Sequence, residues 1–102
     1  MDELIAVAKA LSDPNRVRIV ALIAREGDVC VCELCDTLHL SQPLVSRHLR
    51  QLKAAGIVQS RKTGRWTRYS LAAEPSAVLR CCIETVKNTA APIGPLCRCM
   101  RP

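Results

Sequence analysis

The sequence has no phenylalanine, and only one tryptophan and one tyrosine, among its 102 residues. A core without bulky aromatic side chains has to be built from Leu, Ile, Val and Ala. A chain of this length buries only a limited share of its surface when it folds. The sequence therefore predicts one domain, from residue 1 to about residue 91, that gains further burial by self-association.

The sequence also lacks an apolar run long enough to cross a membrane, since Lys9, Arg16 and Arg25 interrupt its apolar segments. Its first residues, Met1-Asp2-Glu3, are acidic, unlike the basic start of a secretory signal. Its seven cysteines are an odd number and cannot all pair within one chain. These features favour a cytoplasmic protein without a membrane partner, whose clustered thiols serve metal or redox chemistry.

Acidic side chains are absent between Ser41 and Leu71, a stretch that holds seven basic residues. The other eight basic residues are balanced by nine acidic ones, so the net charge of +6 arises in this third of the chain. A solubilising surface normally mixes both signs. A basic segment of one sign instead indicates a polyanionic partner, and nucleic acid is the expected one.

The spacing of apolar residues predicts five helices, over about residues 2–11, 14–26, 33–39, 42–55 and 75–89. A β-hairpin with its turn at Thr63-Gly64 is expected between the fourth and fifth helices. Residues 92–102 are rich in proline and contain Cys97 and Cys99. This segment is predicted to be a flexible C-terminal tail.

The order helix, turn, polar-faced helix and basic hairpin is that of a winged helix-turn-helix. In the fourth helix Val45, Leu49 and Leu52 repeat at helical spacing and are expected to face the core. The opposite side suits the major groove of DNA, and the hairpin suits the flanking phosphates. The candidate DNA-binding residues are Ser41, Gln42, Ser46, Arg47, His48, Arg50 and Lys53 of the helix, and Arg61, Lys62, Arg65 and Arg68 of the hairpin. His48 is equally compatible with a solvated or core position.

Three stretches resemble the ArsR/SmtB family of metal-responsive bacterial repressors: LSDPNRVRIVALI, VCVCELCDTLHLSQPLVSRHLRQLKAAGIV and RKTGRWTRYSL. The resemblance covers about residues 4–71. It implies a mainly helical winged helix-turn-helix with a β-hairpin wing, and a repressor rather than an enzyme. It further implies a homodimer, formed by the first and last helices, that binds double-stranded operator DNA at an imperfect inverted repeat and releases it when an inducer binds.

Three cysteines, Cys30, Cys32 and Cys35, lie at the start of the third predicted helix. Cys32 and Cys35 are three residues apart and share one side of a helix. Cys30 would point about 140–160° away from both if the helix reached back to it. All three bind one ion only if the chain at Cys30–Cys32 is unwound or bent. Ligand binding is therefore expected to distort the first turn of this helix, which packs against the recognition helix.

An all-sulfur site of three thiolates is soft, and trivalent arsenic or antimony binds three sulfurs in a pyramid. The C-x-C-x-x-C motif resembles that of the arsenite-responsive members of the family, which makes As(III) or Sb(III) the expected inducer, with no organic cofactor. Cadmium and lead sensors of the family recruit further cysteines from an N-terminal arm, and this sequence has none before Cys30. Zinc prefers four ligands, and zinc sensors of the family use histidines of the last helix, where this sequence has none.

Four further cysteines are secondary candidates for a thiol site: Cys81, Cys82, Cys97 and Cys99. Cys81 and Cys82 lie in the last predicted helix, where packing in a dimer interface is the simpler expectation. Cys97 and Cys99 form a C-x-C in the tail, outside the pattern that resembles the family. A second site built from these thiols therefore remains a hypothesis beside the first.

Other classes of function are compatible with parts of the pattern. A thiol oxidoreductase would use Cys32 and Cys35 as C-x-x-C, but that chemistry is typical of a βαβ unit, which the sequence does not predict. A repressor of the same fold that responds to Cd, Pb or Zn, or to thiol oxidation, fits the clustered cysteines. A histone-like DNA binder is a weaker alternative, distinguished by competition with unrelated DNA.

Overall fold

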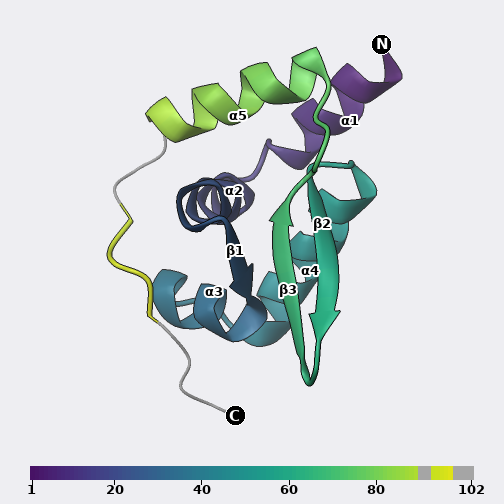
Figure 1. Cartoon of the computed structure of the whole chain (residues 1–102). Helices are drawn as coiled ribbons and strands as arrows, with labels where there is room; N and C mark the ends of the chain where they lie inside the picture. Colours follow the sequence, from purple (N-terminus) through teal and green to yellow (C-terminus); the bar gives the residue numbers. More distant parts are fainter. Residues whose placement is uncertain (90–92, 98–102) are drawn as a thin grey trace.

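The computed structural model describes residues 1–89 and 93–97 (Figure 1). Its elements, in chain order, are α1 (Asp2–Ala10), α2 (Pro14–Glu26), β1 (Asp28–Cys30), α3 (Val31–Leu38), α4 (Gln42–Ala54), β2 (Val58–Thr63), β3 (Trp66–Leu71) and α5 (Ala77–Thr89). All five predicted helices are present, and β2 and β3 form the predicted hairpin. The structure confirms the predicted winged helix-turn-helix.

The helix ends follow local chemistry. The side chain of Asp13 accepts hydrogen bonds from the N–H groups of Asn15 and Arg16, and Pro14 occupies the first position of α2. Gly27 ends α2 with φ of 90°, a value that other residues rarely adopt. Ser41 caps α4 through its hydroxyl, which accepts from the N–H of Leu44 at 3.4 Å. These caps confirm the predicted starts of α2 and α4.

The core is aliphatic, as the lack of aromatic residues requires. Its largest fully buried side chains are Ile19, Leu22, Ile23, Leu34, Leu38, Leu49, Leu52 and Ile57. α2 runs through the middle of the domain, between α5 on one side and α3 on the other (Figure 1). Val45, Leu49 and Leu52 of α4 are all inaccessible to solvent. The prediction that these three face the core is confirmed.

A short strand that the sequence analysis missed, β1, joins the hairpin to make a three-stranded antiparallel sheet of order β1-β3-β2. In its register, Val29 lies opposite Tyr69 and Cys30 lies opposite Arg68. The same Arg68 lies opposite Arg61 of β2. The sheet therefore connects the cysteine-bearing stretch directly to the wing.

The third helix begins two residues earlier than predicted, at Val31, and Cys30 is its N-cap residue. The prediction placed this helix start near Cys32 or Glu33 and was wrong. β1 and its pairing with β3 bring Cys30 into an extended conformation, with φ of −96° and ψ of 165°, and the helix starts at once behind it. The carboxylate of Glu33 accepts the Cys30 N–H at 3.0 Å, which completes the helix start from inside.

The described part of the predicted tail, residues 93–97, is held against the domain. Two guanidinium nitrogens of Arg25 donate to the carbonyl oxygens of Ile93 and Gly94, at 3.0 and 2.9 Å. The N–H of Cys97 donates to Oγ1 of Thr37 at 2.9 Å. Ile93 and Leu96 pack against the hydrophobic core. Cys99 lies outside the described residues.

Two exposed apolar side chains stand out on α1, where Leu4 is 53% and Ile5 47% exposed. α1 lies beside α5 in the fold. Within the described residues, no helix is both long and apolar enough to span a bilayer.

Candidate functional site

The outer side of α4 is polar and accessible, as predicted. Gln42, Arg47, Arg50 and Lys53 are exposed, Ser41 is an exposed N-cap, and Ser46 is half-buried. The Nζ of Lys53 donates to the hydroxyl of Ser60 in β2 at 2.8 Å. This bond ties the end of the recognition helix to the base of the wing.

His48 lies on the inner side of α4, buried against the domain. The residue is only 5% exposed. Nη1 of Arg16 lies 3.3 Å from its Nδ1, and its Nε2 is buried with no hydrogen-bond partner among the described residues. Burial lowers the pKa of His48, and the neighbouring Arg16 and Arg47 lower it further. The sequence left the position of His48 open, and packing against α2 decides it.

The wing presents three accessible basic residues, Arg61, Lys62 and Arg65. The side chain of Arg61 is 76% exposed, and its Nη2 lies 3.8 Å from Oδ2 of Asp28. Arg65 adjoins the turn at Gly64, where φ is 63°. These three positions suit contacts with phosphates.

Arg68 differs from the other wing arginines because it is hydrogen-bonded across to β1. Its Nε and Nη2 both donate to Oδ1 of Asp28, at 3.0 and 2.8 Å. Its side chain is 26% exposed, and the hydrogen bond to Asp28 raises its pKa further. Carboxylates of the same chain, those of Asp28 and Glu33, therefore hold the guanidinium of Arg68.

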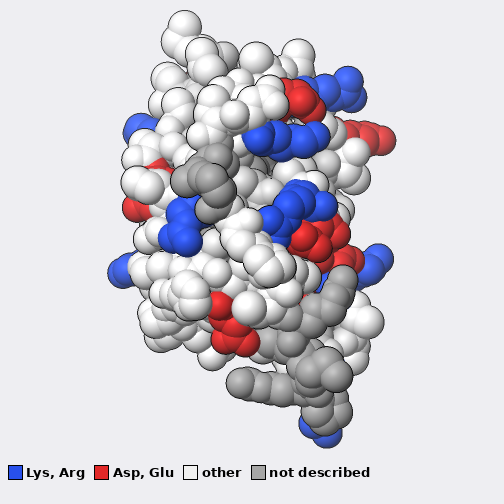
Figure 2. Space-filling view, turned by 90° about the vertical axis from the view of Figure 1, so that its left-hand side faces the viewer, with Lys and Arg blue, Asp and Glu red and all other residues white. Residues whose placement is uncertain are grey.

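Another side of the molecule mixes the two signs of charge. Figure 2 shows the side that lies to the left in Figure 1, where basic and acidic side chains stand beside one another among uncharged residues. Elsewhere in the chain, opposite charges pair directly, as Arg25 and Glu26 do at 2.8 Å. The excess of basic residues lies between Ser41 and Leu71, in the segment that forms α4 and the wing.

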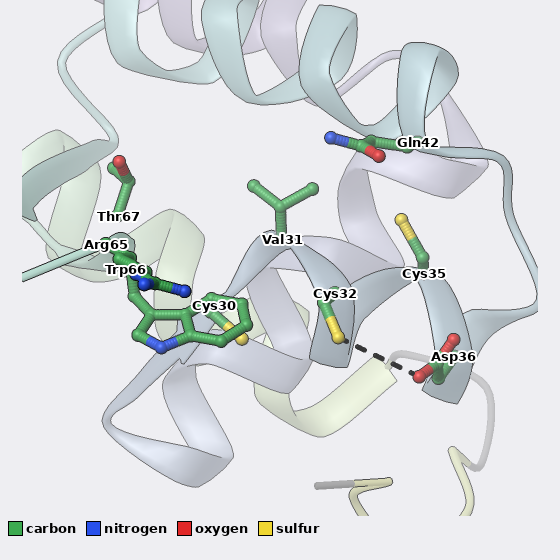
Figure 3. Close-up of a pocket in the computed structure, with 9 residues that line it drawn as sticks. All are labelled: Cys30, Val31, Cys32, Cys35, Asp36, Gln42, Arg65, Trp66 and Thr67. Atoms are coloured by element: carbon green, nitrogen blue, oxygen red, sulfur yellow. Dashed lines mark hydrogen bonds between the residues drawn. The ribbon is translucent and has the colours of Figure 1, made fainter. Parts of the chain in front are cut away.

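The three clustered cysteines occupy what we call the cysteine turn, residues 30–35. Cys30 is 4% exposed, while Cys32 and Cys35 are half-buried on the first turn and a half of α3. Cys32 is disulfide-bonded in this structure, whereas Cys30 and Cys35 are free. The Sγ of Cys32 lies 4.0 Å from Oδ2 of Asp36 (Figure 3).

A cavity of about 410 Å³ lies in front of the cysteine turn. It is lined by Cys30, Val31, Cys32, Cys35 and Asp36 of β1 and α3, by Gln42 of α4, and by Arg65, Trp66 and Thr67 of the wing. Figure 3 shows the sulfurs of Cys32 and Cys35 on the same helix, with the Trp66 ring on the wing side of the cavity. The structure therefore brings the predicted thiols to one cavity that also touches the recognition helix and the wing.

The same cysteines are not assembled as a finished metal site. No group of three or more His, Cys, Asp or Glu side chains within the described part of the chain is placed to hold a metal ion. Three sulfur donors of the right chemistry line the cavity, but Cys30 is the extended N-cap residue and the other two follow on the helix. One small ion reaches all three only after the cysteine turn rearranges, as the spacing predicts.

The protein raises the pKa of two of these thiols. Burial is the main cause at Cys30, and the nearby Glu33 carboxylate adds to it. Burial also raises the pKa of Cys35, helped by the negative charge of Asp36. Both effects disfavour the thiolate, which is the form that attacks an electrophile or binds a metal.

Of the secondary cysteines, Cys81, Cys82 and Cys97 belong to the described residues and lie away from the cysteine turn. Cys81 is exposed and Cys82 half-buried on α5, and Cys82 packs against the core. Cys97 is exposed, and its backbone is held by Thr37 at the far end of α3. None of them lines the cavity of the cysteine turn.

Sequence reasoning did not assign several residues of this region to the site, namely Asp28, Val31, Glu33, Asp36, Trp66 and Thr67. Glu33 stands three residues after Cys30, the spacing of a capping box. That spacing is the one signal in the sequence that could have located the start of α3. Nothing local to Asp28 indicates its pairing with Arg68, because 40 residues separate them.

The fold and the exposed basic surface of α4 and the wing define a winged helix-turn-helix DNA-binding protein. Residues 13–60 match the family described as "Bacterial regulatory protein, arsR family". An uncharacterized HTH-type transcriptional regulator of Methanocaldococcus jannaschii is 48% identical over 63 residues, which cover 62% of this chain and 71% of that protein. The chain belongs to the ArsR family of bacterial transcriptional regulators.

Further similarities agree with this assignment. The arsenic resistance transcriptional regulator ArsR1 of Pseudomonas putida is 55% identical over 65 residues, which cover 64% of this chain and 51% of that protein. The chain thus spans about half the length of this relative. A homodimeric winged helix-turn-helix domain from Mycobacterium bovis superposes with a TM-score of 0.74 at 29% identity, covering 87% of this chain and 79% of that domain. Members of this family are DNA-binding regulators and not enzymes, which favours a regulator over the thiol oxidoreductase considered from the sequence.

Proposed function

We propose that this protein is a cytoplasmic transcriptional repressor that binds operator DNA as a homodimer and releases it when trivalent arsenic, or antimony, binds Cys30, Cys32 and Cys35. One observation carries the proposal. The cavity lined by all three cysteines is also lined by Gln42 at the start of the recognition helix and by Arg65 of the wing. A ligand bound there touches both parts of the DNA-binding surface.

The DNA-binding role rests on the accessible polar side of α4 and on the wing. Ser46, Arg47 and Arg50 are expected to reach base edges and phosphates in the major groove. Arg61, Lys62 and Arg65 are expected to contact flanking phosphates, which add affinity with little sequence information. Ser41, Gln42 and Lys53 complete the proposed surface. A two-fold dimer reads an imperfect inverted repeat, with half-sites about one helical turn apart.

The dimer is proposed to form through α1 and α5, and Leu4 and Ile5 of α1 are the exposed apolar side chains that it would cover. The match to a domain described as homodimeric supports this arrangement. A small aliphatic core gains most from burying such side chains against a second copy. In this proposal residues 1–91 carry DNA binding and dimerisation, and residues 92–102 form an appended segment that carries cysteines.

The inducer chemistry balances without an added oxidant or reductant once Cys32 is reduced. For each sulfur, an As–S bond forms as an As–O bond of arsenous acid breaks, and the thiol proton leaves with the hydroxide as water. Three soft sulfur donors suit this ion better than zinc, which prefers a fourth ligand. Regulators named for arsenic resistance among the relatives support the same choice.

Release requires that the inducer bind the rearranged cysteine turn more tightly than the DNA-competent one. Cys30 has to leave its N-cap conformation, which disturbs the start of α3. The wing and α4, which line the same cavity, respond to that change. A coupling free energy of about 1–3 kcal/mol is typical and weakens DNA binding by about 5–150-fold.

The test is the affinity of the fully reduced protein for an operator selected from random duplexes, measured by fluorescence anisotropy with and without arsenite. We expect release by arsenite in the wild type and in the double variant Cys97→Ser/Cys99→Ser, which keeps residues 93–97 in the chain. We expect no release in Cys32→Ser. Release by Cys32→Ser together with loss of release in the double variant would move the inducer site to the C-terminal segment.

A second candidate function is a repressor of the same fold that responds to thiol oxidation. The disulfide state of Cys32 is the observation that favours it. Titration of the operator complex with a disulfide oxidant in the absence of arsenite decides between the two. The second function would replace the first if the oxidant releases the operator and arsenite, tested separately under strictly reducing conditions, does not.

A further inference from the structure

We propose that Arg68 and Glu33 form the mechanical link through which the cysteine turn controls the wing, so that Arg68 is a positioning residue and not a DNA contact. The inference deepens the proposed function and rests on it. It assigns a role to an ion-paired arginine, a buried carboxylate and a short strand that the DNA-binding surface and the thiol site do not explain.

The first part of the link is the hold of Asp28 on Arg68. Two donors of Arg68 reach Oδ1 of Asp28 at 2.8 and 3.0 Å, and Nη2 also reaches the Asp28 carbonyl oxygen at 3.4 Å. Asp28 begins β1 and Arg68 lies in the middle of β3. The guanidinium therefore fastens the wing strand to the strand that leads into the cysteine turn.

The second part is a carboxylate oxygen that two elements share. Oε1 of Glu33 accepts the N–H of Cys30 at 3.0 Å and lies 3.5 Å from Nη2 of Arg68. Glu33 thus touches the first cysteine of the turn and the wing arginine with the same atom. Cys30 and Arg68 are also direct partners in the β1–β3 ladder.

Burial makes this shared contact decisive. The Glu33 side chain is 5% exposed, and a carboxylate at such a position needs its partners. Removing one partner from a buried charge is strongly unfavourable, because the charge is then left without compensation. If Cys30 leaves the N-cap conformation to join an ion with Cys32 and Cys35, Glu33 loses the Cys30 N–H and its contact with Arg68 has to readjust.

The wing responds to this change because Arg68 lies on β3, the strand that the wing shares with the β1–β3 pair. β3 runs from Trp66 to Leu71, and Arg65 and Trp66 at its start line the thiol cavity. A shift of Arg68 therefore changes the seating of the Arg65 end of the wing against DNA. The link has two discrete states, with Glu33 either capping Cys30 or not, as a switch requires.

Arg61 provides a matched control in the same part of the wing. It lies directly opposite Arg68 in the β2–β3 ladder and 3.8 Å from the other oxygen of Asp28, but it is exposed and forms no ion pair with Glu33 among the bridges of the described residues. Removing Arg61 weakens the wing without cutting the link. Removing the charge of Glu33 cuts the link without touching the DNA-binding surface.

The experiment measures operator affinity by anisotropy, and arsenite bound per chain by equilibrium dialysis, for the reduced wild type, Glu33→Gln and Arg61→Ala. The amide of Glu33→Gln still accepts the Cys30 N–H but no longer attracts Arg68. We expect Glu33→Gln to bind operator and arsenite, with the arsenite-driven fall in operator affinity reduced to less than a third of the wild-type factor. Arg61→Ala is expected to bind operator more weakly with and without arsenite, with the wild-type factor preserved.

A wild-type release factor in Glu33→Gln would overturn the link and leave the proposed function intact. Failure of the wild type itself to release DNA would overturn both. If Glu33→Gln does not fold, hydrogen exchange of the wild type decides, since the link predicts that arsenite speeds amide exchange in residues 66–71 as well as in 30–33. Faster exchange confined to 30–33 would overturn it.

Discussion

α4 and α3 both begin behind an N-cap residue with a small side chain, Ser41 in α4 and Cys30 in α3. The two helix starts are stabilised in different ways. α4 is capped by Ser41, whose own hydroxyl accepts the N–H of Leu44. Cys30 is the N-cap residue of α3. Its N–H donates to the carboxylate of Glu33, and that carboxylate forms an ion pair with Arg68. The first start depends on one residue beside it. The second depends on a contact between two strands and a helix.

The two helix starts meet different requirements of a regulatory protein. A surface that reads DNA has to keep its side chains in fixed register, and a local cap achieves this. A turn that responds to a ligand has to be disrupted without unfolding the domain, and a weak cap with a distant support allows this. Four measurements test whether the cysteine turn and the DNA-binding surface differ in this way.

The largest effect is expected from Cys35→Ser. Without this sulfur the cavity no longer offers three thiols, and the arsenite-driven release, about 5–150-fold in the wild type by the usual size of such coupling, should fall to none. Operator affinity without arsenite should stay close to that of the wild type, because Cys35 lies outside the DNA-binding surface. Anisotropy titrations with and without arsenite measure both.

Cys81→Ser is the control for Cys35→Ser, since Cys81 is exposed on α5 and remote from the cavity. It should retain full release. Persistent release in Cys35→Ser would show that the cysteine turn is not the part of the molecule that senses the ligand.

The next effect is a dependence of the arsenite association rate on pH. The raised pKa values of Cys30 and Cys35 keep these thiols protonated near neutral pH. Because the thiolate attacks, and its fraction grows about tenfold per pH unit below the pKa, the rate should rise by about that factor per unit between pH 6 and 8. Stopped-flow fluorescence of Trp66, which lines the cavity, follows the reaction. A rate that does not change with pH would contradict the assignment of these thiols as the attacking groups.

A smaller effect is expected from Ser41→Ala. Loss of an N-cap hydroxyl typically lowers the free energy of unfolding by about 0.5–2 kcal/mol, and the 3.4 Å distance to Leu44 favours the lower half of that range. Urea denaturation measures it. Cys30→Ser is the opposing control, since Ser caps helices better than Cys and should not lower the free energy of unfolding. Equal losses in both variants would mean that the two helix starts do not differ in the way described.

The smallest effect is expected from Arg65→Ala. Loss of one phosphate contact should reduce the slope of log affinity against log salt by about one, which amounts to roughly a threefold change between 50 and 200 mM salt. The loss should be similar for operator and for unrelated DNA. A loss confined to the operator would assign Arg65 to base reading, and an unchanged slope would remove it from the DNA surface.

Much of α4 and the wing was predictable because the signals are local. The repeat of Val45, Leu49 and Leu52 defines the buried side of a helix wherever that helix occurs. Ser41 and Gly56 bracket it, and the hairpin turn contains Gly64. His48 escaped prediction, since its position near the edge of the buried stripe is decided by the packing of α2 and by Arg16.

The cysteine turn was predictable in composition and in the need for a rearrangement, but not in its geometry. β1 has three residues, too few for a period of two to be recognised, and it forms only because β3 is available to pair with it. That pairing moves the helix start to Val31 and buries Cys30. It also brings Arg68 within reach of Asp28 and Glu33, where its side chain is only 26% exposed.

The sequence by itself determined the helices, the hairpin, the excess of basic residues between Ser41 and Leu71 and the soft chemistry of three neighbouring thiols, because each depends on residues within one or two turns of one another. Only the tertiary structure decided that Asp28, Glu33 and Arg68 form one network and that Trp66 and Gln42 share a cavity with the cysteines. Those contacts join residues up to 40 positions apart along the chain. Which side chains meet across such a separation depends on the packing of α2, the sheet and α4 against one another, and no local pattern of residues encodes it.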